Sequence, residues 1–185
     1  MSKIIVNQIE SSDGTTDVLN SLSAVNVAGA GIGQVLQVVS ATVDEVDTTT
    51  AVTLTNSALS AAITPSSTSS KILINASVTA GSNADENNIP AFGLRRDSTD
   101  IGLSTTASGS RKNAITGPGK SSNNFLGNCA LTHLDSPSTT SEAIYYVTFA
   151  ARSGNTTQIN STGSDGDNAY TWRGSSTITL MEIAG

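Results

Sequence analysis

The sequence contains a single cysteine, Cys129, and a single histidine, His133, among 185 residues. One cysteine excludes an intrachain disulfide framework and a cysteine zinc cluster. No run of 18 apolar residues occurs, so no membrane-spanning helix is expected. The opening Met1–Val6 segment is followed by Asn7 and Gln8, too soon for the apolar region of a signal peptide. We therefore expect synthesis in the cytoplasm without a signal peptide.

Aromatic residues make up only 4% of the chain and charged residues 13%, and the net charge is −6. A negatively charged chain is poorly suited to binding nucleic acid through its phosphates. The charge is unevenly spread, because residues 1–50 carry −5 and the remaining 135 residues only −1. The first part of the chain should therefore differ in structure from the rest.

Hydroxyl side chains are abundant, with 28 serines and 25 threonines. Leu, Ile, Val and Phe together number 41, just above the level of roughly 20% below which chains usually fail to fold. These apolar residues must therefore be well placed, or supplemented by a partner subunit.

Alternating apolar and polar residues predict strands in the second part of the chain. The clearest covers residues 71–80, where Ile72, Ile74 and Val78 fall on one face and Asn75 and Ser77 on the other. Further strands are expected within 51–63, 91–103, 125–134, 142–152 and 177–183. Because no amphipathic helix of useful length intervenes, we predict an all-β fold, a jelly roll or β-sandwich, over residues 49–185.

The segment 142–152 has two apolar faces, although a strand of a two-layer sandwich needs only one. An identical subunit is the expected cover for the second face. The candidate contacts between subunits are Ile144, Tyr146 and Phe149.

Residues 1–48 are expected to form an N-terminal arm. Apolar residues from Val18 to Ile32 follow heptad spacing, but the glycines at 29, 31 and 33 oppose a helix. Two structures remain open for this segment, a brief three-stranded coiled segment and an extended arm. Neither buries its own apolar residues within one chain, so we expect the arm to lie along a partner.

Two motifs resemble catalytic or nucleotide-binding motifs, but the spacing of their residues does not fit those functions. The glycines at 29, 31 and 33 precede no Lys-Ser/Thr pair and no helix, as a phosphate loop would require. Cys129 and His133 lie four residues apart on a predicted strand, about 13 Å, which is too far for a nucleophile and its base. With no paired carboxylates or metal-ligand spacing, we expect no enzyme, no cofactor and no metal site.

Two loops carry candidate contact residues. Arg111 and Lys112 belong to a stretch rich in basic residues that suits an anionic glycan, and Trp172 is an aromatic residue in a predicted loop. In the same loop, Asp165 and Asp167 cluster oxygens that calcium could use, but the glutamate of a known calcium loop is missing. Calcium binding is left open by the sequence.

Four sequence segments resemble, in the same order, segments of the C-terminal domain of bacteriophage tail-fibre-type proteins, particularly those of marine and cyanobacterial phages. The matching segments are residues 63–74, 92–102, 134–141 and 176–185. The opening residues 2–9 look like the attachment region of the same kind of virion protein.

This resemblance implies a homotrimeric jelly roll, similar to C1q and tumour-necrosis-factor domains, on the exterior of a phage virion. The arm would attach to other phage structural proteins through Ile4, Ile5, Val6 and Ile9, without membrane insertion. The outer loops of such a short fibre would contact host surface glycan or protein. A head fibre or capsid decoration protein that stabilises the phage head is the alternative, and a glycan-modifying enzyme is a third.

Overall fold

The computed structural model describes residues 33–83, 90–107, 109–118 and 124–185. The expected attachment residues Ile4, Ile5, Val6 and Ile9, and the heptad-spaced segment, lie outside this range. Within it the chain forms ten strands in two antiparallel sheets and no helix, which confirms the all-β prediction and is consistent with a β-sandwich. The described residues therefore contain no helix able to cross a bilayer.

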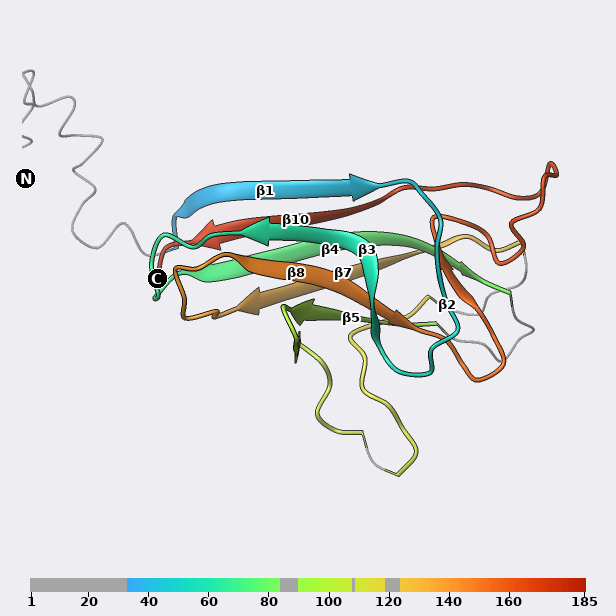
Figure 1. Cartoon of the computed structure of the whole chain (residues 1–185), viewed down its shortest axis with the longest axis horizontal. Helices are drawn as coiled ribbons and strands as arrows, with labels where there is room; N and C mark the ends of the chain where they lie inside the picture. The colour runs from blue at the N-terminus through green and yellow to red at the C-terminus, as the bar shows by residue number, and fades with distance from the viewer. Residues whose placement is uncertain (1–32, 84–89, 108, 119–123) are drawn as a thin grey trace, which may run out of the picture.

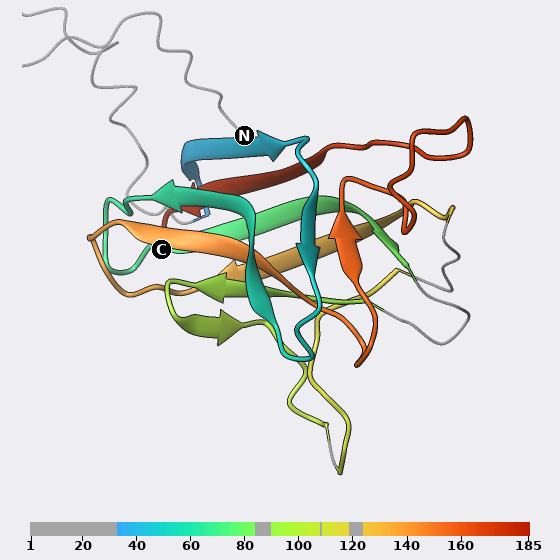
Figure 2. The ribbon, with the colours of Figure 1, turned by 45° about the vertical axis from the view of Figure 1, so that its right-hand side comes forward.

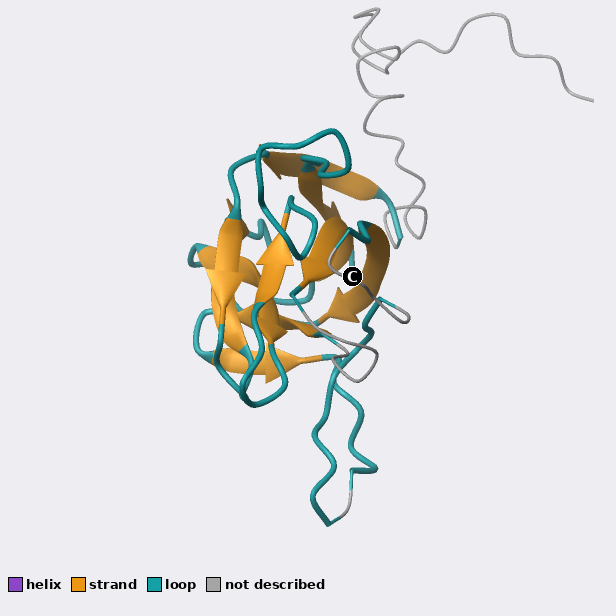
Figure 3. Ribbon diagram, turned by 90° about the vertical axis from the view of Figure 1, so that its right-hand side faces the viewer, coloured by secondary structure: helices purple, strands orange, loops and turns teal. Residues whose placement is uncertain are grey.

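The two sheets lie face to face (Figures 1 and 3). The six-stranded sheet has the order β1 (Val35–Val43), β10 (Ser176–Ile183), β4 (Lys71–Ser82), β9 (Thr157–Ile159) and β2 (Asp47–Thr49), with β7 (Gly127–Asp135) also paired to β4. The four-stranded sheet has the order β3 (Thr55–Ile63), β8 (Ala143–Ala150), β5 (Ala91–Arg96) and β6 (Thr99–Ile101).

The core between the sheets follows the predicted alternation. In β4, Ile72, Ile74 and Val78 are fully buried, while Ser77 on the opposite face is exposed. In β10 the same period buries Ile178 and Leu180. Because each strand alternates, one sheet face supplies the core and the other remains a surface.

The sandwich begins earlier in the chain than expected. β1 pairs with β10 from Val35↔Ile183 to Val43↔Ser176, and β2 pairs with β9. The predicted boundary between residues 48 and 49 therefore does not mark the start of the β domain. The side chains of Val39, Ala41 and Val43 pack on the core, so β1 belongs to the sandwich and not to the arm.

The two faces of β8 differ from the expectation. Tyr145, Val147 and Phe149 point into the core, and the Phe149 ring stacks on Phe92 with 6.5 Å between ring centroids. Phe149 is 1% exposed within a single chain, which removes it from the outer face where subunit contacts were expected. Ile144 and Tyr146 do lie on the outer face, where both are half-buried.

The outer face of β8 is partly covered by loops of the same chain, whereas the sequence suggested an identical subunit as cover. Thr148 is fully buried there, opposite Gly93 in β5. A Cβ added to Gly93 would lie 2.9 Å from the side chains of Leu54 and Leu103, so both leucines lie against this face. The apolar second face of β8 is thus no sign by itself of a subunit contact.

A polar link joins the two sheets inside the sandwich. The Tyr145 hydroxyl in β8 donates a 2.8 Å hydrogen bond to Asp135 in β7, and Arg96 in β5 pairs with the same carboxylate. Burial, together with the hydrogen bond to Asp135, raises the pKa of Tyr145. The hydroxyl therefore stays protonated and acts as the hydrogen-bond donor.

The described chain begins and ends at one end of the sandwich. There the Gly33 amide donates to the Ala184 carbonyl, and the Ala184 amide donates to the Gln34 carbonyl. The loop between β9 and β10 lies at the opposite end, and Figure 2 shows it projecting beyond the paired strands β2 and β9. We call residues 161–174 the distal loop.

Candidate recognition surfaces

The distal loop exposes two aromatic side chains. Tyr170 is 73% exposed and Trp172 is 66% exposed, the highest values for large hydrophobic side chains among the described residues. By contrast, the rings of Phe92, Tyr145 and Phe149 are buried in the core. Aromatic rings with a polar atom suit contact surfaces, because they offer a large apolar area and a hydrogen-bonding group.

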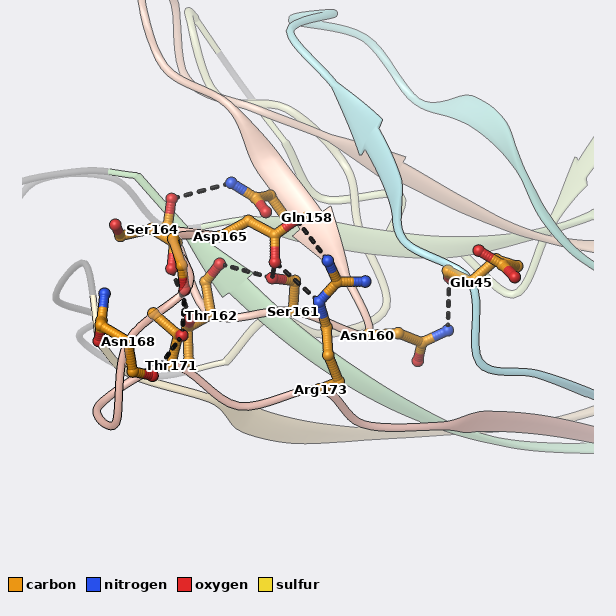
Figure 4. A network of polar contacts seen from close by, with 12 residues as sticks. Glu45, Gln158, Asn160, Ser161, Thr162, Ser164, Asp165, Asn168, Thr171 and Arg173 are labelled. Atoms are coloured by element: carbon orange, nitrogen blue, oxygen red, sulfur yellow. Dashed lines mark hydrogen bonds and ion pairs between the residues drawn. The ribbon is translucent and has the colours of Figure 1, made fainter.

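An ion pair braces the base of the distal loop. The Arg173 guanidinium contacts both carboxylate oxygens of Asp165, at 2.7 Å from Nε to Oδ1 and 2.8 Å from Nη2 to Oδ2 (Figure 4). The Ser161 hydroxyl donates to Asp165 Oδ1 at 2.9 Å. This bidentate geometry fixes the direction in which the chain leaves Trp172, one residue before Arg173.

A buried polar network holds the start of the loop. Asn160 is fully buried in the left-handed region with φ of 63°, and its side-chain amide donates to the carbonyls of Val43 and Glu45 at 3.0 Å each. The Ser176 hydroxyl donates to Asn160 Oδ1 at 2.6 Å. Asn tolerates this backbone conformation better than most residues, which explains its presence here.

Gly163 permits a close backbone approach that completes this base. A Cβ at Gly163 would lie 1.8 Å from the Ser82 carbonyl oxygen, so only glycine fits. Gln158 Nε2 donates to the Gly163 carbonyl at 2.8 Å. The distal loop therefore stands on a tightly packed base.

The turn at the tip is organised by Asn168 and Thr171. The Asn168 side-chain oxygen accepts from the Tyr170 amide at 2.9 Å, and the Thr171 hydroxyl donates to the Asn168 carbonyl at 3.0 Å. A polar hollow of about 420 Å³ lies beside this turn, with Trp172, Asp167 and Asn168 among its lining residues. An aromatic wall with nearby amide and carboxylate groups offers stacking and hydrogen bonds to a polar ligand.

The arrangement at Asp165 does not suit calcium. Its carboxylate is occupied by the guanidinium of Arg173 and the hydroxyl of Ser161. Among the residues that the structure describes, no group of three or more His, Cys, Asp or Glu side chains is placed to hold a metal ion. The question that the sequence left open therefore finds no geometric support at Asp165 and Asp167.

Cys129 and His133 lie where the sequence placed them, four residues apart on β7. Their cross-strand partners in β4 are Val78 and Ile74, respectively. Cys129 is buried, and burial raises the pKa of its thiol to about 11, so it is protonated at neutral pH. It acts as a small core residue.

Arg111 and Lys112 lie far along the chain from Trp172 and line a different hollow. They belong to the long loop after β6, which projects away from the sandwich in Figure 3. The Lys112 ammonium donates to the Val52 carbonyl, which ties this loop to the segment between β2 and β3. The structure thus separates the predicted outer-loop contacts into two surfaces.

Sequence reasoning missed an apolar row on the outer face of the six-stranded sheet. Cross-strand register places Val38 of β1 beside Met181 of β10, Met181 beside Leu73 of β4, and Leu73 beside Leu134 of β7. Val38 is 57% exposed and Leu134 47%. Part of the signal was Leu73, the single apolar residue that interrupts the polar face of residues 71–80.

One row next to the apolar row contains Val35, Ile183 and the charged Lys71, and the neighbouring row on its other side is polar and uncharged. The neighbouring row contains Ser40, Thr179, Asn75 and Thr132. Hydrogen bonds link its members, from Thr132 to Asn75 at 3.0 Å and between Ser40 and Thr179 at 3.1 Å. This polar row places no like charges against a second copy, and Lys71 is the one charged side chain in the two flanking rows.

No protein-family model matches the sequence, and a search of curated proteins finds no match.

Proposed function

We propose that the chain is a structural protein of a bacteriophage virion, a short trimeric fibre on the particle surface that binds the host cell surface. The observation that carries this proposal is the position of Tyr170 and Trp172, exposed on a braced loop at the end opposite residues 33 and 185. The sequence resemblance to phage fibre proteins supplies the biological context. Binding, and no covalent chemistry, is the proposed activity.

In this proposal the apolar row is the contact between copies. Four adjoining apolar side chains, Val38, Met181, Leu73 and Leu134, bury their area only if another surface covers them. The Ser, Thr and Asn side chains on one side of the apolar row carry no charge, and Lys71 is the one charge on the other side. The net charge of −6 on each copy is therefore not concentrated at the interface. A closed threefold arrangement covers this face on every copy.

Two half-buried residues on opposite outer faces test this arrangement. In Leu73→Asp a charge enters the apolar row, so sedimentation equilibrium at micromolar concentration should find monomers. In the matched variant Ile144→Asp the charge enters the outer face of the four-stranded sheet, and the trimer should persist. Trimers of Leu73→Asp together with monomers of Ile144→Asp would place the contact on β8, as the sequence first suggested. Monomers of the unaltered chain would contradict the trimer itself.

Attachment to the particle is assigned to the N-terminal arm, because the described chain enters the sandwich at the end opposite the distal loop. Deleting residues 1–30 should leave soluble trimers that no longer join the particle. If the shortened chain still joins, attachment lies within the sandwich.

Imaging of assembled particles separates the fibre from capsid decoration. A few trimers at the tail are expected for a tail fibre. Dozens of copies over the head would support the alternative, a head fibre or decoration protein that stabilises the capsid. Absence of the chain from purified particles would overturn both.

A further inference from the structure

The outer face of the four-stranded sheet carries a second concave surface, distinct from the distal loop. Two adjoining hollows of about 480 Å³ each share Val52, Ala91, Lys112 and Ala150 in their linings. We call the two hollows together the basic groove. Its lining residues come from the long loop after β6, from the segment between β2 and β3, and from β5 and the end of β8.

The floor of the basic groove is apolar. It is formed by Val52, Leu54, Leu103 and the two alanines at 91 and 150. Arg95 fixes this floor, because its guanidinium donates to the Leu54 carbonyl at 3.2 Å and to Asn56 Oδ1 at 2.8 Å. The floor is thus held in place by the sheet beneath it.

The rim of the basic groove is positively charged. Arg95, Arg111, Lys112 and Arg152 line the two hollows, which is four of the nine basic residues of the chain. Asp100 is the one carboxylate that the described residues contribute to the lining, and it is paired with Arg95 at 2.6 Å. A local excess of positive charge on a chain with net charge −6 marks a place that attracts anions.

Each cation of the rim carries several N–H donors. Lys112 donates to the Val52 carbonyl, but its ammonium has three donors. Arg111 and Arg152 have contacts of their own, and each guanidinium has five N–H donors in a planar fork that suits carboxylates and sulfates.

The backbone around the groove disfavours a peptide that binds as an added strand. β5 and β8 are each hydrogen-bonded on both sides, by β6 and β8 and by β3 and β5, respectively. No free strand edge is therefore offered by the floor, and a ligand must bind through side chains. A sugar ring presents an apolar C–H face and polar substituents, which matches an apolar floor below a basic rim.

We propose that the basic groove binds an acidic polysaccharide through carboxylate or sulfate groups held by Arg111, Lys112 and Arg152. The choice of a saccharide rests on the proposed role at a cell surface. The groove lies on the opposite side of the sandwich from the apolar row, so trimer formation and ligand binding do not compete.

Calorimetry on the full chain with purified saccharides tests this proposal. A heparin hexasaccharide should bind at low salt, a neutral dextran oligomer of the same length should not, and added salt should weaken the binding. Lys112→Ser should reduce the affinity about tenfold, through loss of a charge-assisted contact. Lys71→Ser, which removes one exposed lysine from the six-stranded sheet, should leave the affinity unchanged.

Three outcomes overturn the groove assignment: equal loss of affinity in Lys71→Ser and Lys112→Ser, equal binding of dextran, and binding of a poly-glutamate peptide as tightly as the hexasaccharide. The first outcome would indicate unspecific charge attraction, and the third an acidic peptide as the ligand. Arg152→Ser provides a second variant if Lys112→Ser fails to fold by circular dichroism. These measurements need no virus particle, so they test saccharide binding separately from the virion assignment. Either proposal can fail while the other holds.

Discussion

The side-chain amide of Gln37 donates a 2.6 Å hydrogen bond to the carboxylate of Glu182, across 145 positions of the chain. Glu182 is fully buried, at an inward position of β10 that continues the series Ile178 and Leu180. The backbone amide and the hydroxyl of Ser66 donate to its other oxygen, at 2.7 Å and 2.6 Å. The carboxylate thus ties β1 and the loop between β3 and β4 to the edge of the core.

This hydrogen bonding predicts a loss of stability in acid. Burial alone raises the pKa of Glu182, but the hydrogen bonds from Ser66 and Gln37 outweigh burial and lower the pKa from 4.5 to about 2. Because the folded pKa is the lower one, the stabilisation is complete above pH 4.5 and is lost as the pH falls toward 2. Glu182→Gln should reduce the free energy of unfolding at neutral pH by about 1–3 kcal/mol.

Urea unfolding of the variant and the unaltered chain, at one protein concentration, measures this effect. The difference between the two should be largest at pH 7 and should shrink at pH 3. Glu142→Gln, at an exposed position before β8, is the matched control and should change stability by less than about 0.5 kcal/mol. A Glu182→Gln difference that is the same at both pH values would contradict the assignment.

The fold class followed from the sequence because the strands alternate strictly. Residues 71–80 and 177–183 bury the side chains that their period predicts. Which strands pair with each other could not be predicted from the sequence. Partners such as Val38 and Met181 are distant in the chain, and their register depends on the whole sheet. Glu182 could have been noticed as a charge at an inward position, but its donors come from two other segments.

The link between the sheets predicts unequal effects of two adjacent tyrosines. Tyr145→Phe removes the hydrogen bond to Asp135 inside the sandwich and should cost about 1 kcal/mol of unfolding free energy. Tyr146→Phe, on the outer face, should change it by less than about 0.5 kcal/mol. Thermal and urea unfolding of both variants provide the comparison, and equal losses would show that the Asp135 contact contributes nothing.

The close approach at Gly163 predicts a position-specific cost. Gly163→Ala forces the chain away from the Ser82 carbonyl and should destabilise the protein by about 1–3 kcal/mol. In Gly166→Ala the added carbon is 3.1 Å from the end of the Asn168 side chain, which can move aside. The control should therefore unfold within about 0.5 kcal/mol of the unaltered chain. Comparable losses in both variants would contradict the packing described at the loop base.

Trp172 is the only tryptophan and reports directly on the distal loop. Its emission in the folded protein should be close to that of tryptophan in water, because 66% of the side chain is exposed. Asp165→Asn, which weakens the brace to Arg173, should lower the fluorescence anisotropy while changing the unfolding free energy by less than about 1 kcal/mol. Strongly blue-shifted emission, or unchanged anisotropy in Asp165→Asn, would contradict an exposed ring on a braced loop.

We predicted Trp172, Arg111 and Lys112 as ligand contacts from the sequence, because loops rich in Ser and Gly contain few other side chains that could recognise a ligand. The sequence could not assign these residues to two separate surfaces, because that depends on where the loop after β6 lies in the folded chain (Figure 3). Arg95 and Arg96 illustrate the same limit. Because adjacent residues of a strand point to opposite faces, Arg95 pairs with Asp100 at the surface and Arg96 pairs with Asp135 in the interior. The sequence does not reveal these partners, and the partners determine the two roles.

Residues 33 and 185 lie together, at the end of the sandwich opposite the distal loop. A fluorescent protein fused after Gly185 would lie at the end of the sandwich that we propose for attachment. A short peptide inserted between Gly166 and Asp167 would be presented outward at the far end, in place of the native tip. If the proposed fibre function holds, exchanging the tip would change the surface to which the particle binds and leave the sandwich intact.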